Sequence, residues 1–243
     1  MSKFMSYFVT EGDDGFALTT SGKIVCGVVT LVLFLLLFLL FNKKKNTSNA
    51  EVSDNKPQNK SLFTIKQLAF SSLALAIAYV LSYFKIGIDW LWGGSATLFS
   101  MFFVTVIGYW YGPKIGLVSA FAYGILQFLQ GGAGAIVSIL QLCLDYFVAF
   151  GALGLSGFFS NKKHGLVIGY IVAILARGAI HSIGGYLFWM DYMPDNFPKT
   201  LAVVYPICYN YAYILLEGIL TVALLCLPPV KTCFARLKKM ALE

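Results

Sequence analysis

The stretch ILQLCLDYFVAFGALGLSGFF, residues 139–159, indicates the class of protein to which this chain belongs. It is apolar and long enough to cross a bilayer, since a transmembrane helix needs about 20 predominantly apolar residues. Asp145 nevertheless lies inside it. An ionisable side chain within a membrane span is costly, and it normally faces the bundle interior, pairs with another group or marks a ligand pathway. Asp145 is therefore the first candidate functional residue.

The composition of the whole chain agrees with a membrane location. Hydrophobic residues make up 58% of the 243 residues, charged residues make up 12%, and the mean hydropathy is +0.76. A soluble domain carries about 25% charged residues, so this chain has too little polar surface to cover a water-facing globule. Long apolar stretches recur along it, and the sequence therefore predicts an all-α integral membrane protein that crosses the cell membrane several times.

The chain divides into four predicted parts. Residues 1–22 form a polar segment, residues 23–42 an apolar segment, residues 43–61 a polar flexible linker that begins with three lysines, and residues 62–243 the main body. A signal peptide is the competing interpretation of residues 23–42. The basic region before them is weak and no small-residue cleavage site follows them, so we expect an extra N-terminal transmembrane helix that anchors the chain.

The main body contains apolar segments that predict a six-helix bundle: residues 65–84, 97–111, 115–130, 136–159, 166–189 and 200–227. Basic and acidic loops alternate between them. Lys66, Lys114, the pair Lys162 and Lys163, and the basic tail fall on one side, and positive charge marks the cytoplasmic side. We therefore expect both ends of the body in the cytoplasm and the N-terminus of the chain outside. The net charge of +7 lies in these loops, whereas a nucleic-acid-binding protein would gather it on one folded face.

Four ionisable residues fall inside the predicted helices of the body: Asp145, Arg177, His181 and Glu217. Residues four apart share a helix face, and Arg177 and His181 continue at this spacing to Gly185 and Trp189. The pattern predicts a polar pocket with aromatic walls in the outer half of the bundle. A carboxylate beside aromatic rings suits a flat organic cation. The alternative is that Asp145, Arg177 and Glu217 neutralise one another.

The motifs of enzymes and metal sites are not found in the sequence. Ser182 follows His181 directly, and adjacent helical residues do not face each other. The glycines at residues 131–134 lack the Lys and Ser or Thr that complete a phosphate-binding loop. The five cysteines show no paired spacing that would indicate disulfides or zinc. We expect no enzyme, no cofactor and no metal, and any use of ATP would need another subunit.

Four ordered blocks resemble a known family: GGSATL (93–98), QLCLDYFVAFGALGLSGFF (141–159), RGAIHSIGGYLFWMDYMP (177–194) and VVYPICYN (203–210). The body is similar to the ThiT family, the thiamine-specific substrate-binding (S) components of energy-coupling factor (ECF) transporters. The resemblance implies a six-helix bundle that captures thiamine on the outer side with high affinity. It also implies partners, namely a membrane scaffold subunit and two ATPase subunits that use the ATP.

The resemblance implies roles for particular residues as well. Matching positions for thiamine contact are Asp145, Tyr146, His181, Trp189, Tyr205, Asn210 and, in the first outer loop, Trp92 or alternatively Trp90. The acid on the fourth helix is Asp here where relatives can carry Glu, and a further binding Tyr of the family falls on Ala135. Small residues spaced by four on the first body helix, Ala74 and Ala78, match the family's contact with the scaffold subunit.

Other functions stay open at this stage. The chain could be an S component for another vitamin or for a thiamine precursor. It could also be a secondary carrier that works without ATPase partners, or an intramembrane hydrolase that depends on Ser182.

Overall fold

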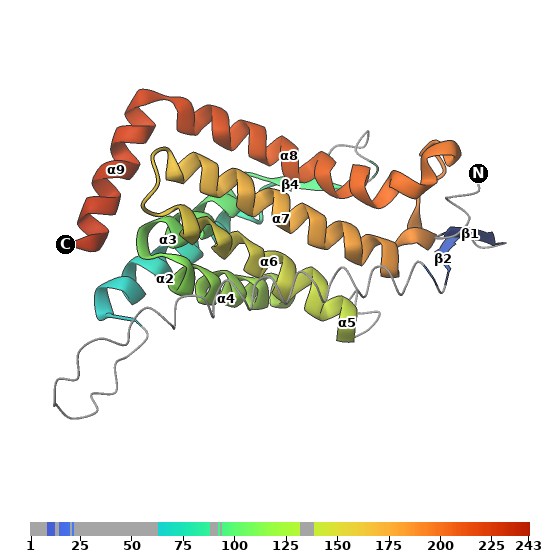
Figure 1. Cartoon of the computed structure of the whole chain (residues 1–243), viewed down its shortest axis with the longest axis horizontal. Helices are drawn as coiled ribbons and strands as arrows, with labels where there is room; N and C mark the ends of the chain where they lie inside the picture. Colours follow the sequence, from blue (N-terminus) through green and yellow to red (C-terminus); the bar gives the residue numbers. More distant parts are fainter. Residues whose placement is uncertain are drawn as a thin grey trace.

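The structure, a computed structural model, describes residues 9–12, 15–19, 21, 63–87, 92, 94–131 and 139–243. The predicted anchor helix over residues 23–42 and the linker over residues 43–61 lie outside these residues, as do Trp90 and Ala135. Within them, each of the six apolar segments of the body corresponds to a helical stretch, and the helices pack into an elongated bundle (Figure 1).

The bundle is built in sequence order. Its first half consists of α2 (Ile65–Leu81), α3 (Ser100–Tyr111) and α4 (Pro113–Gly131). The fourth segment runs through α5 (Ile139–Leu142), the π-helical turn η4 (Cys143–Val148), α6 (Ala149–Gly151) and the 3-10 helix η5 (Ala152–Phe159). It is followed by α7 (Gly165–Phe188), the 3-10 turns η6 (Met190–Tyr192) and η7 (Lys199–Val204), and α8 (Tyr205–Cys226).

The turn between α3 and α4 agrees with the sequence. Gly112 has a φ of 84°, which favours glycine, and α4 begins at Pro113. Proline is suited to the first helical position because its missing N–H is not needed there. The turn therefore places α3 and α4 side by side.

The fourth segment departs from a uniform α-helix. Asp145 lies in the π-helical turn η4, and the carbonyl oxygen of Tyr146 in the same turn lies against Gly124 of α4. Further along, a Cβ added to Gly154 would lie 2.5 Å from the Cα of Leu117. These two glycines let the backbones of α4 and the fourth segment approach closely.

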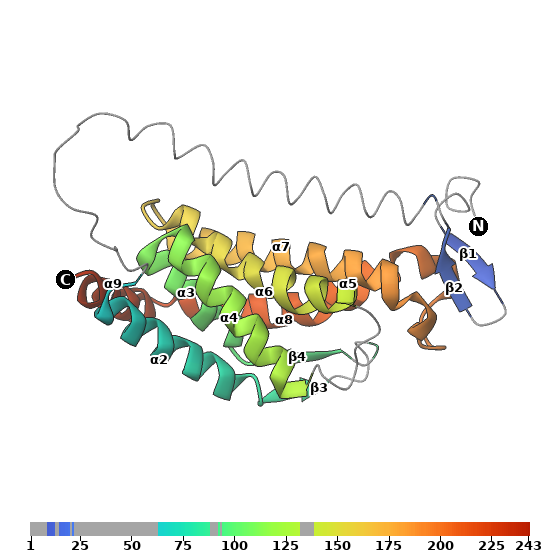
Figure 2. The same ribbon diagram turned by 90° about the horizontal axis from the view of Figure 1, so that it is seen from below.

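Two short antiparallel hairpins accompany the helices and were not predicted. Strands β1 (Val9–Gly12) and β2 (Gly15–Leu18) form one, and β2 lies against η6. Strands β3 (Lys85–Gly87) and β4 (Ser95–Thr97), which follow α2 in the chain and precede α3, form the other, and β4 lies against α8 (Figure 2). The predicted second segment thus begins as a strand, and its helix begins at Ser100.

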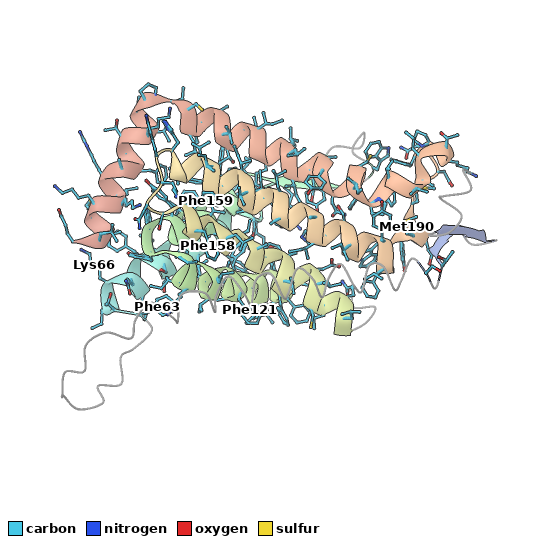
Figure 3. The ribbon with its side chains drawn as sticks, in the orientation of Figure 1. Phe63, Lys66, Phe121, Phe158, Phe159 and Met190 are labelled. Carbon is cyan, nitrogen blue, oxygen red and sulfur yellow. The ribbon has the colours of Figure 1, made fainter. Side chains whose placement is uncertain are left out.

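The basic tail is a helix, α9 (Pro228–Leu242), that crosses the end of the bundle opposite the β1–β2 hairpin (Figure 1). Lys238 of α9 contacts the bundle at this end: its Nζ donates to the carbonyl oxygen of Ser160 and lies 3.8 Å from the centroid of the Tyr109 ring. The hydroxyl of Tyr111 donates to the carbonyl oxygen of Ala241 at 3.3 Å. Figure 3 shows Lys66 at this same end and Met190 at the other.

The outer surface of the bundle is apolar. Large hydrophobic side chains are exposed on α2, α4, α7 and α8 and at the end of η5, among them Phe121 and Phe158 (Figure 3). Among the described residues, three helical stretches are long and apolar enough to cross a membrane: Leu140–Phe159, Gly165–Phe188 and Lys199–Cys226. A large exposed apolar surface is costly in water, and lipid is the environment that suits it.

The small residues of α2 lie inside this bundle. Ala74 is 3% exposed and Ala78 is 0% exposed, and the carbonyl oxygen of Ala78 accepts a hydrogen bond from the hydroxyl of Tyr123 on α4. Their small size lets α2 pack against its neighbours within the chain. A contact of either residue with a partner subunit stays a prediction, and neither side chain is on the surface here.

Candidate ligand-binding pocket

A cavity of about 570 Å³ opens between η4, α4, α7 and α8. This volume is in the usual range for sites that bind small organic molecules. All the ligand-contact residues predicted from the sequence line it: Trp92, Asp145, Tyr146, His181, Trp189, Tyr205 and Asn210. Their contact with a ligand stays a prediction, but the structure brings every one of them to one cavity.

Asp145 is 9% exposed and has polar contacts with three side chains. Its Oδ2 accepts from Gln141 Nε2 at 2.9 Å and from the indole Nε1 of Trp189 at 3.1 Å. Its Oδ1 lies 3.4 Å from His181 Nδ1. A carboxylate has about four lone-pair sites, so these partners orient the group and leave it capacity to accept from a ligand.

His181 connects Asp145 to Arg177. The Nε of Arg177 donates to His181 Nε2 at 3.3 Å, so Nε2 is an acceptor and the ring proton is on Nδ1, facing Asp145. The guanidinium carbon of Arg177 also lies 4.2 Å from the centroid of the Phe150 ring, a cation–π distance. The four-residue spacing thus produces the predicted stripe along α7, which starts at Arg177 and ends at Trp189, the residue that follows the helix.

Aromatic rings form the wall of the cavity on the α8 side. Trp92 lies 4.9 Å from Phe197, and Phe197 lies 5.1 Å from Tyr205, measured between ring centroids. The series continues from Tyr205 to Tyr209 at 5.7 Å. On the opposite side, Tyr146 stacks on Phe150 with an interplanar angle of 18°. A flat cationic ligand would meet ring faces and edges on both sides.

Asn210 is held in one orientation. Its Nδ2 donates to the carbonyl oxygen of Pro206 at 2.8 Å, and its Oδ1 accepts from the hydroxyl of Tyr213 at 2.8 Å. The amide keeps one N–H and one lone pair for a ligand. Asn210 is therefore a pre-oriented polar group on the cavity wall.

Two adjacent glycines of α7 make the close packing around the cavity possible. A Cβ added to Gly184 would lie 2.6 Å from Asp145 Oδ1, and one added to Gly185 would lie 2.7 Å from the Cβ of Pro206. Real Cβ atoms do not come this close to other atoms. Glycine at residue 184 therefore lets α7 and the carboxylate meet.

Sequence reasoning did not place several further lining residues: Lys85, Gln127, Gln130, Phe150, Tyr192, Tyr209 and Tyr213. Gln127 and Gln130 are three apart on α4, a spacing that could have indicated a shared polar face. Lys85 gave no such signal, because it reaches the cavity through the β3–β4 hairpin.

The alternative to a binding site was that the buried charged residues neutralise one another. Glu217 does not pair with Arg177 in the structure. Its carboxylate accepts from the hydroxyl of Thr97 and the main-chain N–H of Met101. In the part of the chain that the structure describes, Arg177 lies at ion-pair distance from no carboxylate, and it contacts His181 and Phe150. The same part shows no group of His, Cys, Asp and Glu side chains that could hold a metal ion.

Comparison with known proteins gives the family. The profile of the thiamine transporter protein family (Thia_YuaJ) matches residues 68–236, a span that contains every residue lining the cavity. The chain belongs to this family. It is 30% identical over 183 residues to the thiamine transporter ThiT of Bacillus subtilis (strain 168), covering 70% of this chain and 92% of that relative.

Two further relatives agree. The thiamine transporter ThiT of Lacticaseibacillus paracasei is 32% identical over 126 residues, which cover 44% of this chain and 61% of the relative. A solved structure of ThiT from Listeria monocytogenes has a TM-score of 0.51 and 25% identity, covering 67% of this chain and 94% of that one. The predicted membership of the ThiT family and the predicted all-α membrane fold are thereby confirmed.

Proposed function

We propose that this member of the thiamine transporter family is an S component that captures thiamine with high affinity on the outer side of the cell membrane. The observation that carries the proposal is the Asp145 carboxylate, oriented by Gln141, His181 and Trp189 at the wall of an aromatic cavity. Thiamine combines a cationic thiazolium ring with an aminopyrimidine that carries hydrogen-bond donors and acceptors. It therefore matches both the charge and the rings of the cavity.

Each cavity residue has a role in this proposal. Asp145 accepts from the aminopyrimidine or offsets the thiazolium charge, since charge-assisted hydrogen bonds are the stronger ones. Trp189 and His181 contact the thiazolium ring. Tyr146, Tyr205 and Asn210 fix the pyrimidine end. The chain performs no chemistry on the vitamin, and the family relatives are named as transporters.

Energy for uptake comes, in this proposal, from an ECF module of one membrane scaffold subunit and two ATPases. The chain itself would need no cofactor. In this proposal the end that carries Lys66 and the basic helix α9 faces the cytoplasm, because positive charge marks that side of a membrane protein (Figures 1 and 3). The cavity would then be open toward the outside, where the β1–β2 hairpin lies against η6.

The test is a titration of the detergent-purified chain with thiamine, followed by tryptophan fluorescence. Trp92 and Trp189 line the cavity, so we expect saturable quenching at submicromolar thiamine in the wild type and its loss in Asp145→Ala. Asp195→Ala, at an exposed residue, is the control and should bind as the wild type does. A flat titration of well-folded wild-type protein would contradict the proposal.

Two rival functions are separated by related measurements. Competition with isolated thiazole and pyrimidine precursors would show whether a fragment binds better than thiamine. Uptake into vesicles by this chain alone, driven by an ion gradient, would indicate a secondary carrier and remove the need for ATPase partners.

A further inference from the structure

Glu217 of α8 is a buried carboxylate that the cavity does not use. It is 3% exposed and is not among the lining residues. Its Oε2 accepts from Thr97 Oγ1 at 2.6 Å, and its Oε1 accepts from the main-chain N–H of Met101 at 2.9 Å. Both donors are more than a hundred residues away in sequence, so the contact ties α8 to the junction of β4 and α3.

The junction needs this partner. The first N–H groups of a helix have no acceptor within the helix, and Phe99, which precedes α3, makes no side-chain cap and has a φ of 59°. Glu217 supplies the missing acceptor from another helix. A negative charge at a helix N-terminus is also favoured by the helix dipole. The carboxylate therefore fixes where α3 begins and in which direction it leaves β4.

The junction of β4 and α3 is connected to the cavity wall through the β3–β4 hairpin. Thr97 is the register partner of Lys85 in the β3–β4 hairpin, and Lys85 lines the cavity. Trp92, between the two strands in sequence, lines it as well and packs against Phe197. A displacement of Thr97 would be transmitted through the strand pairing to Lys85.

We propose that Glu217 is a positioning residue for ligand binding: through Thr97 and Met101 it holds the β3–β4 hairpin, and with it the Lys85 and Trp92 side of the cavity, in place opposite Asp145. The inference rests on the proposed function for its ligand. It assigns to a residue outside the cavity a part of the affinity for thiamine.

The first experiment compares two isosteric substitutions at threonines that hydrogen-bond to Glu217. Thr97→Val removes the hydroxyl that donates to the Glu217 side chain. Thr221→Val is the matched control, since Thr221 is 0% exposed and donates to the main-chain oxygen of Glu217 instead. We expect Thr97→Val to weaken thiamine binding about tenfold, as for the loss of one charge-assisted hydrogen bond, with faster dissociation. Thr221→Val should leave the affinity within about twofold, because an intrahelical hydroxyl bond adds little.

Two further variants separate positioning from general loss of structure. Thr97→Ser keeps the hydroxyl and should restore wild-type binding. Glu217→Gln should weaken binding as Thr97→Val does, and the double variant should be no weaker than either one, since residues that act as one unit are not additive. Wild-type affinity in both Thr97→Val and Glu217→Gln would overturn the proposal, and so would full additivity.

Hydrogen exchange tests the contact of Glu217 with Thr97 and Met101 without any ligand. We expect the amides of residues 95–101 to exchange faster in Thr97→Val and Glu217→Gln than in the wild type or in Thr221→Val, because loss of this contact makes local opening of the segment more frequent. Unchanged exchange would overturn the inference even if thiamine binds normally. Wild-type protein that fails to bind thiamine would overturn the proposed function, whatever the exchange shows.

Discussion

Asp145 and Glu217 are both carboxylates buried in the same bundle, but their hydrogen-bond donors come from different parts of the molecule. The donors to Asp145 are side chains of the cavity wall, from Gln141, His181 and Trp189. The donors to Glu217 are a hydroxyl and a main-chain N–H at the start of α3, away from the cavity. Burial of an acid in a membrane helix therefore does not by itself mark a ligand site. The location of the groups that donate hydrogen bonds to the carboxylate distinguishes a role in ligand binding from a structural role.

The largest effect on thiamine affinity is expected when each carboxylate is replaced by its amide isostere, which tests the distinction between Asp145 and Glu217. In Asp145→Asn, an amide N–H would oppose the N–H groups of Trp189 or Gln141, and we expect thiamine affinity to fall about 100-fold, which is about 2.7 kcal/mol. Glu217→Gln should cost less in affinity and more in thermal stability. Calorimetric titration and thermal unfolding in detergent measure the two quantities. Equal losses of affinity in both variants would remove the distinction.

A smaller effect is expected at the glycine that faces Asp145. In Gly184→Ala the new Cβ would lie 2.6 Å from Oδ1, so the carboxylate must shift, and we expect affinity to fall about tenfold, as for one lost charge-assisted hydrogen bond. Gly151→Ala is the control, because a Cβ there would meet no atom within 4 Å. Binding of labelled thiamine measures both. Wild-type affinity in Gly184→Ala would mean that the position of this carboxylate is not critical.

The smallest effect is expected from the indole N–H of Trp189. Trp189→Phe keeps an aromatic ring and removes the donor to Asp145 Oδ2, and we expect about a fivefold loss of affinity, as for a single hydrogen bond of about 1 kcal/mol. Trp110→Phe is the matched control, since Trp110 is buried against Phe70 and Tyr111, away from the cavity. It should lower stability without changing the affinity measured by calorimetry. A greater loss in the control would contradict this assignment.

Helical spacing predicted much of the site. The four-residue period on α7 placed His181, Gly185 and Trp189 on one face, and the position of Asp145 inside an apolar segment singled it out. The matching positions of the ThiT family also include Tyr146 and the α8 residues Tyr205 and Asn210. These predictions succeed because a regular helix fixes the direction of each side chain from its number alone.

Features that depend on packing between distant segments could not be predicted. Lys85 reaches the cavity because β3 pairs with β4, which no helical period indicates. The sequence left open the alternative that Glu217 and Arg177 neutralise one another. The partners of Glu217 are Thr97 and Met101, since a spacing gives the direction of a side chain but not what another helix presents at that depth.

The π-helical turn Cys143–Val148 has a consequence for any change in the length of this segment. Such a turn holds an extra residue, and each residue of an α-helix advances the chain by about 100°. Deleting one residue there would regularise the helix and leave the residues on either side of the turn nearly in phase, but it would change the directions of the side chains within the turn, Asp145 among them. Gln141 and Asp145 would then no longer both meet the groups that they face now. New ligand specificities in this scaffold should therefore be sought by exchanging side chains, with the number of residues between Gln141 and Gly154 held constant.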